Sequence, residues 1–224
     1  MAIAPSEKSR ILIVDDHPLF REGMQQMIDR NPSLKVCGEV ANATAALKAV
    51  AELEPDLVLV DISLEVGGDG IELVKSLKAK YENLPILVIS MHNESLYAER
   101  ALRAGALGYV MKNEAARTVK AAILKVLGGD IFLSEKMSAS VLTRMMHGKN
   151  EPPVSPVEQL SDRELQVFQM LGEGKTSRQI AEELDLTIPT IHSFRNRIKE
   201  KLNFQNATEL VLRANQWVLE RASK

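Results

Sequence analysis

The sequence has little cysteine and no long apolar run. Its one cysteine among 224 residues, Cys37, excludes a disulfide within the chain and favours a reducing compartment. Because Cys37 lies in the apolar segment LKVCGEV, we interpret it as a small core residue and not as a nucleophile. No apolar stretch approaches the roughly 20 residues of a membrane-spanning helix. The polar N-terminus also lacks the apolar core of a signal peptide, so we expect a cytoplasmic protein without a membrane partner.

The chain also lacks a charge excess of either sign. Its 28 Lys and Arg residues nearly balance 30 Asp and Glu residues, and the net charge is −2. This balance gives no global signature of nucleic-acid binding, so any contact with DNA must come from a local patch. The length allows one large or two ordinary domains.

Short apolar segments alternate with helical patterns from residue 10 to residue 130. The expected strands are ILIVD, LKVCGEV, DLVLVD, PILVIS and GYVMK, and the expected helices cover residues 18–29, 43–53, 70–80, 95–104 and 114–127. The side of the first helix that we expect to face the core is formed by Leu19, Phe20, Gly23, Met24, Met27 and Ile28. Five buried parallel strands between helices predict a doubly wound α/β domain.

A second, all-helical domain is expected after a proline-rich segment. Gly128 and Gly129 end the last helix of the first domain, and a further helix at 135–147 leads into HGKNEPPVSPVEQ. We place the linker at 131–156 and the second domain at 157–224, with helices at 162–171, 177–184, 188–202 and 207–221. Capping residues mark three of the helix starts: Ser161 with Glu164, Thr176 with Gln179, and Asn206 with Glu209.

Ionisable side chains follow three of the expected strands. Asp15 and Asp16, Asp61, and Lys112 stand at carboxyl ends, where parallel sheets form ligand sites. Clustered carboxylates repel one another without a cation, and oxygen ligands suit Mg²⁺. A carboxylate in such a site can accept a phosphoryl group, whose charge the metal and a lysine offset. Ser90, at the end of PILVIS, is placed to hydrogen-bond a phosphoryl oxygen. A single aspartate after a strand is more often a cap, but the whole set favours a chemical site.

Residues 176–202 have the outline of a helix-turn-helix. The second helix carries an excess of positive charge that can neutralise phosphates, in Arg195, Arg197, Lys199 and Lys201. Its N-terminal side chains Thr190, His192 and Ser193 would face base edges in the major groove. Thr176 and Thr187, at the starts of the two helices, are further candidate DNA contacts. A basic helix face is usually a solvated surface, but its place in this motif favours DNA binding.

The segments VDDHPLFREG, DISL, PILVIS and GYVMK resemble the receiver domain of two-component response regulators over roughly residues 10–130. The resemblance implies that Asp61 is the phosphoacceptor and that Asp16 and Asp61 bind Mg²⁺ directly. It also implies that the backbone carbonyl of Ser63 completes the metal site and that Asp15 acts through water.

The same resemblance implies a switch pair. Ser90 would move to the phosphoryl group and Tyr109 would turn inward behind it. Without the resemblance, Tyr109 is equally well a half-buried strand aromatic. One departure is the loop after Asp61, where receivers commonly have Pro four residues on and Gly eight residues on. This chain has Glu65 and, nine residues on, Gly70, so we expect a longer and more flexible loop.

The segment from Leu160 to Leu202 resembles the four-helix output domain of the LuxR/NarL/FixJ family, and the whole chain resembles a NarL-type response regulator. The chain departs from that family at His192 and Phe194, where Lys and His are usual, so its operator cannot be inferred from relatives. The resemblance also implies that the last helix forms a dimer contact, although most of its apolar residues are expected in the core.

We therefore expect a transcriptional regulator that a sensor histidine kinase phosphorylates on Asp61. Phosphorylation would control dimerisation or domain release, and a homodimer would bind two DNA half-sites. An alternative is a DNA-binding regulator that works without phosphate and uses its receiver for dimerisation. A phosphatase of the haloacid dehalogenase type is disfavoured, because it needs an aspartate where this chain has Ser63.

Overall fold

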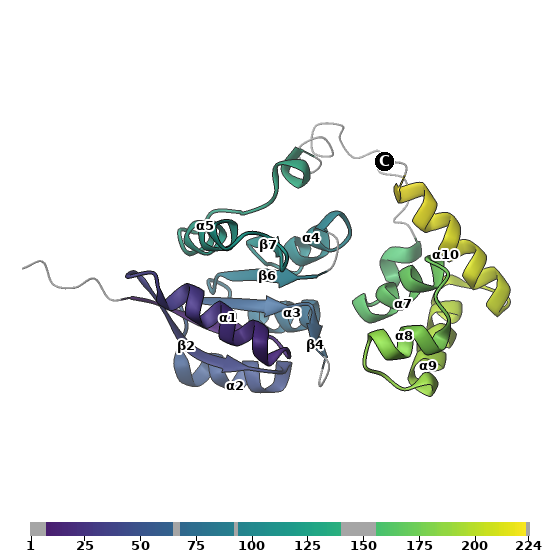
Figure 1. The fold of residues 1–224 in the computed structure, drawn as a ribbon, viewed down its shortest axis with the longest axis horizontal. Coiled ribbons are helices and arrows are strands. Elements are labelled where there is room, and N and C mark those ends of the chain that lie inside the picture. Colours follow the sequence, from purple (N-terminus) through teal and green to yellow (C-terminus); the bar gives the residue numbers. More distant parts are fainter. Residues whose placement is uncertain (1–7, 65–67, 92–93, 140–155, 223–224) are drawn as a thin grey trace, which may run out of the picture. The chain divides into compact units, whose positions relative to one another are not determined.

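The computed structural model describes residues 8–64, 68–91, 94–139 and 156–222. The chain divides into two compact units, residues 1–148 and 149–224, and each is described by itself (Figure 1). In the described residues no helix is both long and apolar enough to cross a membrane.

The N-terminal unit is built on a parallel sheet of five strands in the order β2-β1-β3-β6-β7. The strands are β1 (Ser9–Val14), β2 (Leu34–Val40), β3 (Leu57–Asp61), β6 (Ile86–Ser90) and β7 (Gly108–Met111). Every residue of β3 and β6 is buried, which explains why these strands are continuous apolar runs and not alternating patterns. The predicted doubly wound α/β fold is confirmed.

Helices cover both faces of this sheet. They are α1 (Pro18–Asp29), α2 (Ala43–Leu53), α3 (Gly70–Lys80), α4 (Glu94–Arg103) and α5 (Ala116–Leu127). The buried residues of α1 and α5 pack on one face of the sheet, against strand residues that include Ile11, Leu59 and Ile89. Helices α2, α3 and α4 lie next to one another on the other face (Figure 1).

Three predictions of burial were wrong. Leu19 is 84% exposed and Gly23 is also exposed, because the buried stripe of α1 runs through Met24 and Ile28 and these two residues lie beside it. Cys37 is half-buried and not a core residue, since β2 is an edge strand of the sheet.

The connection after β3 contains a short antiparallel ladder that the sequence did not predict. It joins β4 (Ser63–Leu64) to β5 (Gly68–Asp69), with Ser63 opposite Asp69. The next residue, Gly70, begins α3, and its amide donates to the carbonyl of Ile62 at 2.9 Å. A Cβ atom on Gly70 would lie 2.0 Å from the carbonyl oxygen of Asp61, so the return of the chain against β3 requires glycine. The expected flexibility concerns residues 65–67, which lie outside the described residues.

Helix α5 ends where the sequence predicted, at Gly128 and Gly129. Gly129 has φ +85°, a conformation that glycine adopts without strain. Residues 135–139 are helical, and the rest of the helix expected at 135–147 lies outside the described residues.

The C-terminal unit contains η1 (Pro156–Gln159), α7 (Asp162–Gly172), α8 (Ser177–Glu183), α9 (Ile188–Leu202) and α10 (Ala207–Ala222). The η1 turn, which the sequence did not predict, spans the expected boundary between linker and second domain and packs near α9. Both predicted capping boxes form, at Ser161 and at Thr176. The core includes an edge-to-face contact between Phe168 and Trp217, whose ring centroids lie 5.6 Å apart. This core holds α8 and α9 as the two helices of the predicted helix-turn-helix.

Candidate phosphoacceptor pocket and DNA-binding surface

Three strand ends bring acidic and basic side chains together at one edge of the sheet. Asp15 and Asp16 follow β1, Asp61 ends β3 and Lys112 follows β7. The ammonium of Lys112 lies 2.6 Å from Oδ2 of Asp15 and 2.7 Å from Oδ2 of Asp61. The Lys112 side chain is 6% exposed, so this is a buried group of charges. The structure thus brings together the four ionisable residues that the sequence placed at strand ends.

This pocket has more negative than positive charge. The second oxygen of Asp61, Oδ1, is buried, and no side chain among the described residues donates a hydrogen bond to it. Burial raises the pKa of Asp61 from 3.8 to about 6, against the attraction of Lys112 and with added repulsion from Asp15. Burial also acts to lower the pKa of Lys112, but the carboxylates of Asp61 and Asp15 outweigh it and raise that pKa. A cation would relieve this imbalance.

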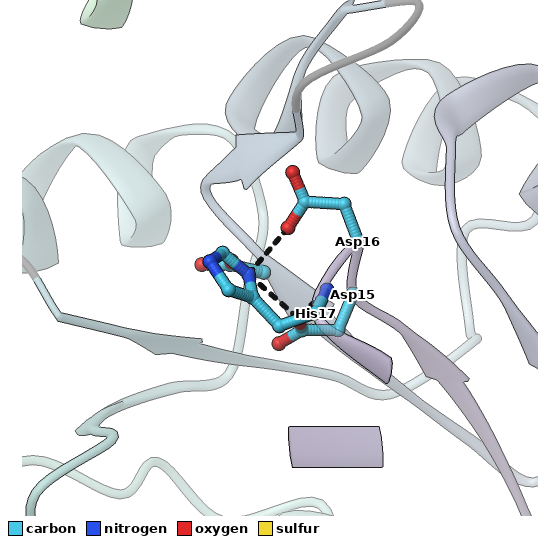
Figure 2. Close-up of side chains that lie close together, drawn as sticks. Asp15, Asp16 and His17 are labelled. Carbon is cyan, nitrogen blue, oxygen red and sulfur yellow. Dashed lines mark hydrogen bonds and ion pairs between the residues drawn. The ribbon is translucent and has the colours of Figure 1, made fainter. Parts of the chain in front are cut away.

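His17 adds a nitrogen to the rim of the pocket, which the sequence analysis missed. Its Nδ1 atom lies 2.6 Å from Oδ1 of Asp16 and 3.3 Å from Oδ1 of Asp15 (Figure 2). The backbone amide of His17 donates to Asp15 at 2.8 Å, which fixes the turn after β1. One ligand atom from each of Asp15, Asp16, His17 and Asp61 lies within 4.8 Å of the others. The position of His17 directly after Asp15 and Asp16 is the feature of the sequence that could have identified it.

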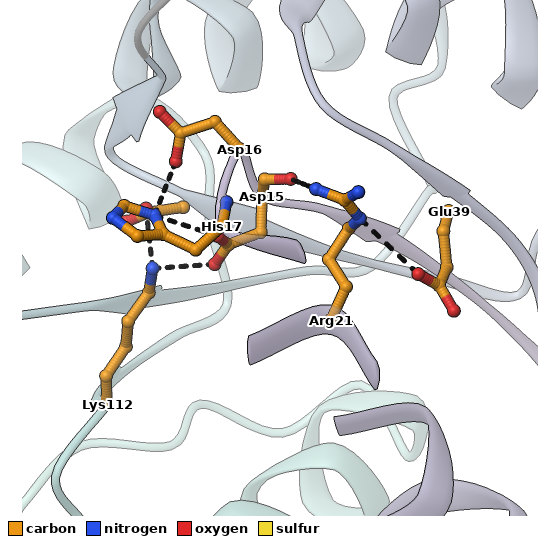
Figure 3. Close-up of polar contacts among 7 residues, drawn as sticks. Asp15, Asp16, His17, Arg21, Glu39 and Lys112 are labelled. Atoms are coloured by element: carbon orange, nitrogen blue, oxygen red, sulfur yellow. Dashed lines mark hydrogen bonds and ion pairs between the residues drawn. The ribbon is translucent and has the colours of Figure 1, made fainter. Parts of the chain in front are cut away.

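Arg21 on α1 holds the backbone of Asp15, at the end of β1, in place. Its guanidinium donates to the carbonyl of Asp15 at 2.6 Å, and its Nε atom lies 3.4 Å from Glu39 on β2 (Figure 3). The residue therefore ties α1 and β2 to the end of β1. Its role is to position Asp15, whose side chain is fully buried.

The predicted switch residues lie on neighbouring strands. Ser90 is fully buried at the end of β6, and its carbonyl accepts the amide of Lys112 at 2.8 Å. Tyr109 is 1% exposed in β7, where it pairs with Val88. Ser63 is half-buried in β4, two residues after Asp61. The roles of these three residues stay predictions.

In the second unit, the solvent-facing side of α9 carries most of the predicted DNA contacts. The opposite side is buried through Ile191, Ile198 and Leu202. Thr190 is half-buried, and its hydroxyl lies 2.8 Å from that of Thr187, the N-cap of α9. The exposed candidates are Thr176, Thr187, His192, Ser193, Arg197 and Lys201.

Two of the predicted cationic contacts have partners within the domain. Arg195 donates to the hydroxyl of Ser177 at 2.6 Å, which joins α9 to the start of α8. Lys201 donates to Oε2 of Glu164 at 2.6 Å, which joins the end of α9 to the start of α7. The Glu164 side chain is 4% exposed, so Lys201 compensates a buried carboxylate. Their contacts with DNA stay predictions, but both have a structural role.

Asn196 is a candidate base contact that the sequence analysis missed. It is exposed on α9, three residues after Ser193 and four after His192, and therefore lies on the same side of the helix. An asparagine amide can make a bidentate contact with adenine. Helical spacing from His192 would have identified it.

Comparisons with known proteins agree with this arrangement. Residues 11–124 match the family model "Response regulator receiver domain", and residues 158–214 match "Bacterial regulatory proteins, luxR family". The chain is 32% identical to the transcriptional regulatory protein LiaR of Bacillus subtilis (strain 168) over 208 residues, which cover 92% of this chain and 97% of LiaR.

Two solved structures are also similar. A LuxR-family response regulator from Aurantimonas sp. SI85-9A1 matches with 33% identity and a TM-score of 0.58, over 62% of this chain and 99% of that one. RcsB from Salmonella enterica serovar Typhimurium, solved bound to promoter rprA with the phosphomimetic BeF3−, matches with 26% identity and a TM-score of 0.58, over 92% of this chain and 97% of RcsB. The protein is therefore a two-component response regulator of the NarL/FixJ type, a family of transcription regulators, with a receiver domain followed by a LuxR-type helix-turn-helix domain.

Proposed function

We propose that a sensor histidine kinase phosphorylates this regulator on Asp61 and that the phosphoryl group controls its binding to DNA. The observation that carries this proposal is the pair formed by Asp61 and Lys112 at 2.7 Å, with Oδ1 of Asp61 buried and without a side-chain donor among the described residues. A carboxylate with an unused oxygen beside a fixed ammonium suits a nucleophile whose product carries extra negative charge.

The residues around Asp61 fit Mg²⁺. Direct ligands would be the carboxylates of Asp16 and Asp61 and the backbone carbonyl of Ser63, while Asp15 would act through water. Hard oxygen donors and an excess of negative charge are the preferences of this ion. When bound, Mg²⁺ would offset charge on the phosphoryl oxygens.

The side chains of the pocket then have distinct roles in the transfer. A carboxylate oxygen of Asp61 attacks the phosphorus of the phosphohistidine donor, and the P–N bond breaks as the new P–O bond forms. The imidazole leaving group takes up a proton. Lys112 pairs with one phosphoryl oxygen, and the hydroxyl of Ser90 donates a hydrogen bond to another. Tyr109 would turn further toward the space behind Ser90.

On the DNA side, α9 would enter the major groove with His192, Ser193 and Asn196 at base edges. Thr190 would also face base edges, Arg197 would contact phosphates, and Thr176 and Thr187 at the helix starts would do so through hydroxyl and amide groups. The similarity to RcsB, which was solved bound to a promoter, supports this part of the proposal.

Two half-sites would be bound by a homodimer. Leu212 and Leu219 on α10 are each 58% exposed and lie seven residues apart, on one side of the helix. In the resembled family the corresponding helix makes the dimer contact, and phosphorylation would promote it in this protein.

The experiment that tests the phosphoacceptor is intact-mass measurement after incubation with Mg²⁺ and acetyl phosphate. We expect one added phosphoryl group on the wild-type protein and none on Asp61→Asn. Addition to the Asp61→Asn protein at equal stoichiometry would reject Asp61 as the acceptor.

A further inference from the structure

The chain that leaves the receiver is bound to the edge of the sheet. We call residues 131–134, which follow α5, the exit strap. The amide of Phe132 donates to the carbonyl of Leu107 at 2.9 Å, and the amide of Tyr109 donates to the carbonyl of Phe132 at 3.1 Å. Phe132 thereby forms a parallel bridge with Gly108 on β7. The exit strap thus extends the sheet beyond its last strand, directly beside a predicted switch residue.

Gly108 allows the close approach of the exit strap. A Cβ atom at this position would lie 2.9 Å from the carbonyl oxygen of Phe132 and 3.2 Å from its Cβ atom. The ring of Phe132 packs against the core between the sheet, α1 and α5. The exit strap is therefore fixed by backbone hydrogen bonds and by apolar contact.

A second attachment comes from α4. Oε1 of Glu94 accepts the amide of Ser134 at 3.0 Å, a contact between residues 40 positions apart. Ser134 in turn accepts the amide of Met137 at 3.1 Å and so caps the helical residues that follow. A carboxylate at a helix start is also favoured by the helix dipole. Glu94 therefore holds the first turn of the segment that leads toward the DNA-binding domain.

Both attachments belong to elements that carry the predicted switch. Glu94 begins α4, four residues after Ser90 at the end of β6. The other attachment uses the backbone of Tyr109 itself. In the proposed switch, a movement of Ser90 toward a phosphoryl group would act on Glu94, four residues on, and a rotation of Tyr109 would act on the strand that holds Phe132.

We propose that the hydrogen bond from Ser134 to Glu94 is an output latch of the receiver. It is closed in the unphosphorylated protein and opens on phosphorylation, which frees the helix start at Ser134. This proposal rests on the proposed function of Asp61 as the phosphoacceptor. It assigns to Glu94 a positioning role outside the pocket, between the switch and the chain that leads to the DNA-binding domain.

Amide hydrogen exchange of the full-length protein tests the latch. The measurement follows the amides of Ser134 and residues 135–139, with and without Mg²⁺ and beryllofluoride as phosphoryl analogue. In the unmodified protein, Glu94→Ala should speed exchange at these amides about tenfold, because a charge-assisted hydrogen bond is lost. Glu94→Gln keeps an acceptor and should exchange nearly as the wild type does. Glu99→Ala is the matched control, because it removes another carboxylate of α4, one that pairs with Arg103 on the same helix.

Beryllofluoride should speed exchange of the same amides in the wild type and change little in Glu94→Ala, where the latch is already open. Protection of amides beside Asp61 reports separately whether the analogue occupies the pocket. Occupancy without a change at Ser134 would overturn the latch alone. Absence of occupancy would reject the proposed function and the latch with it. Equal exchange in wild type and Glu94→Ala before modification would also overturn the latch.

Discussion

The ammonium of Lys112 lies 2.7 Å from Oδ2 of Asp61, although 51 residues separate them in the chain. The same ammonium lies 2.6 Å from Asp15, so one buried cation serves two buried carboxylates. This shortage of positive charge is a property of the unmodified pocket, and the first two predictions depend on it.

Replacing Asp61 with Asn should stabilise the metal-free protein at neutral pH. Folding raises the pKa of Asp61 from 3.8 to about 6, so the folded state holds this proton more tightly than the unfolded chain does. The associated stability is fully present below pH 3.8 and is lost as the pH rises through about 6. At pH 7.5 we expect a gain on the order of 1–3 kcal/mol, while Lys112 keeps Asp15 as its partner.

Chemical denaturation of wild type and Asp61→Asn between pH 4 and 8 measures this difference. Asp130→Asn is the control, because Asp130 is an exposed aspartate of the same domain. A stability difference that does not grow between pH 4 and 7 would contradict the assignment.

Mg²⁺ should raise the melting temperature of the wild-type protein. Binding to the folded state alone contributes about 2.7 kcal/mol at a free ion concentration 100 times Kd. Asp16→Asn removes one expected ligand whose side chain is 5% exposed, and it should abolish most of the shift. A chelator should reverse the shift in the wild type. An equal Mg²⁺ effect in both proteins would exclude Asp16 as a ligand.

Gly70→Ala should damage both folding and the pocket. The added methyl group would overlap the carbonyl of Asp61, which belongs to the backbone of β3 and cannot move aside. We expect a loss of about 3 kcal/mol and slower phosphoryl uptake. The control is Gly23→Ala on α1, where no described atom outside the adjacent residues and the backbone of the same helix lies within 4 Å of the new methyl group, and alanine favours helix. Normal stability and uptake in Gly70→Ala would show that the chain can move away from β3 at this point at little cost.

The basic residues of α9 should divide into two groups. Lys201→Met leaves the buried carboxylate of Glu164 without its cation and should lower stability by about 1–2 kcal/mol. Because Glu164 engages the Lys201 ammonium, the salt dependence of DNA binding should change less in this variant than in Arg197→Met. Arg197→Met should leave stability nearly unchanged and reduce the slope of log affinity against log salt by about 1. Denaturation and salt titrations of the two variants distinguish these effects. If Arg197→Met lowered stability and Lys201→Met reduced the salt slope, the structural and DNA-contacting roles of the two residues would be exchanged.

The sequence predicted most of the fold because its strands are buried on both faces and its helices have clear caps. The segments DLVLVD and PILVIS show this for strands, and Ser161 and Thr176 show it for helix starts. The pocket was predictable because parallel topology places strand ends at one edge. The β4–β5 ladder was not predictable, since strands of two residues have no periodicity. The pair of Lys201 with Glu164 depends on tertiary packing across 37 positions, which a pattern along one helix does not contain.

The measurement that tests the central proposal most directly is the affinity of the full-length protein for DNA with and without beryllofluoride. The probe is a duplex selected by the protein from a random library, and binding is followed by fluorescence anisotropy at fixed salt and Mg²⁺. We predict at least about tenfold tighter binding with the analogue, a coupling of about 1.4 kcal/mol, and no such gain for Asp61→Asn. Equal affinity in both states, with the pocket occupied, would contradict phosphorylation control and would favour a regulator that uses its receiver only for dimerisation.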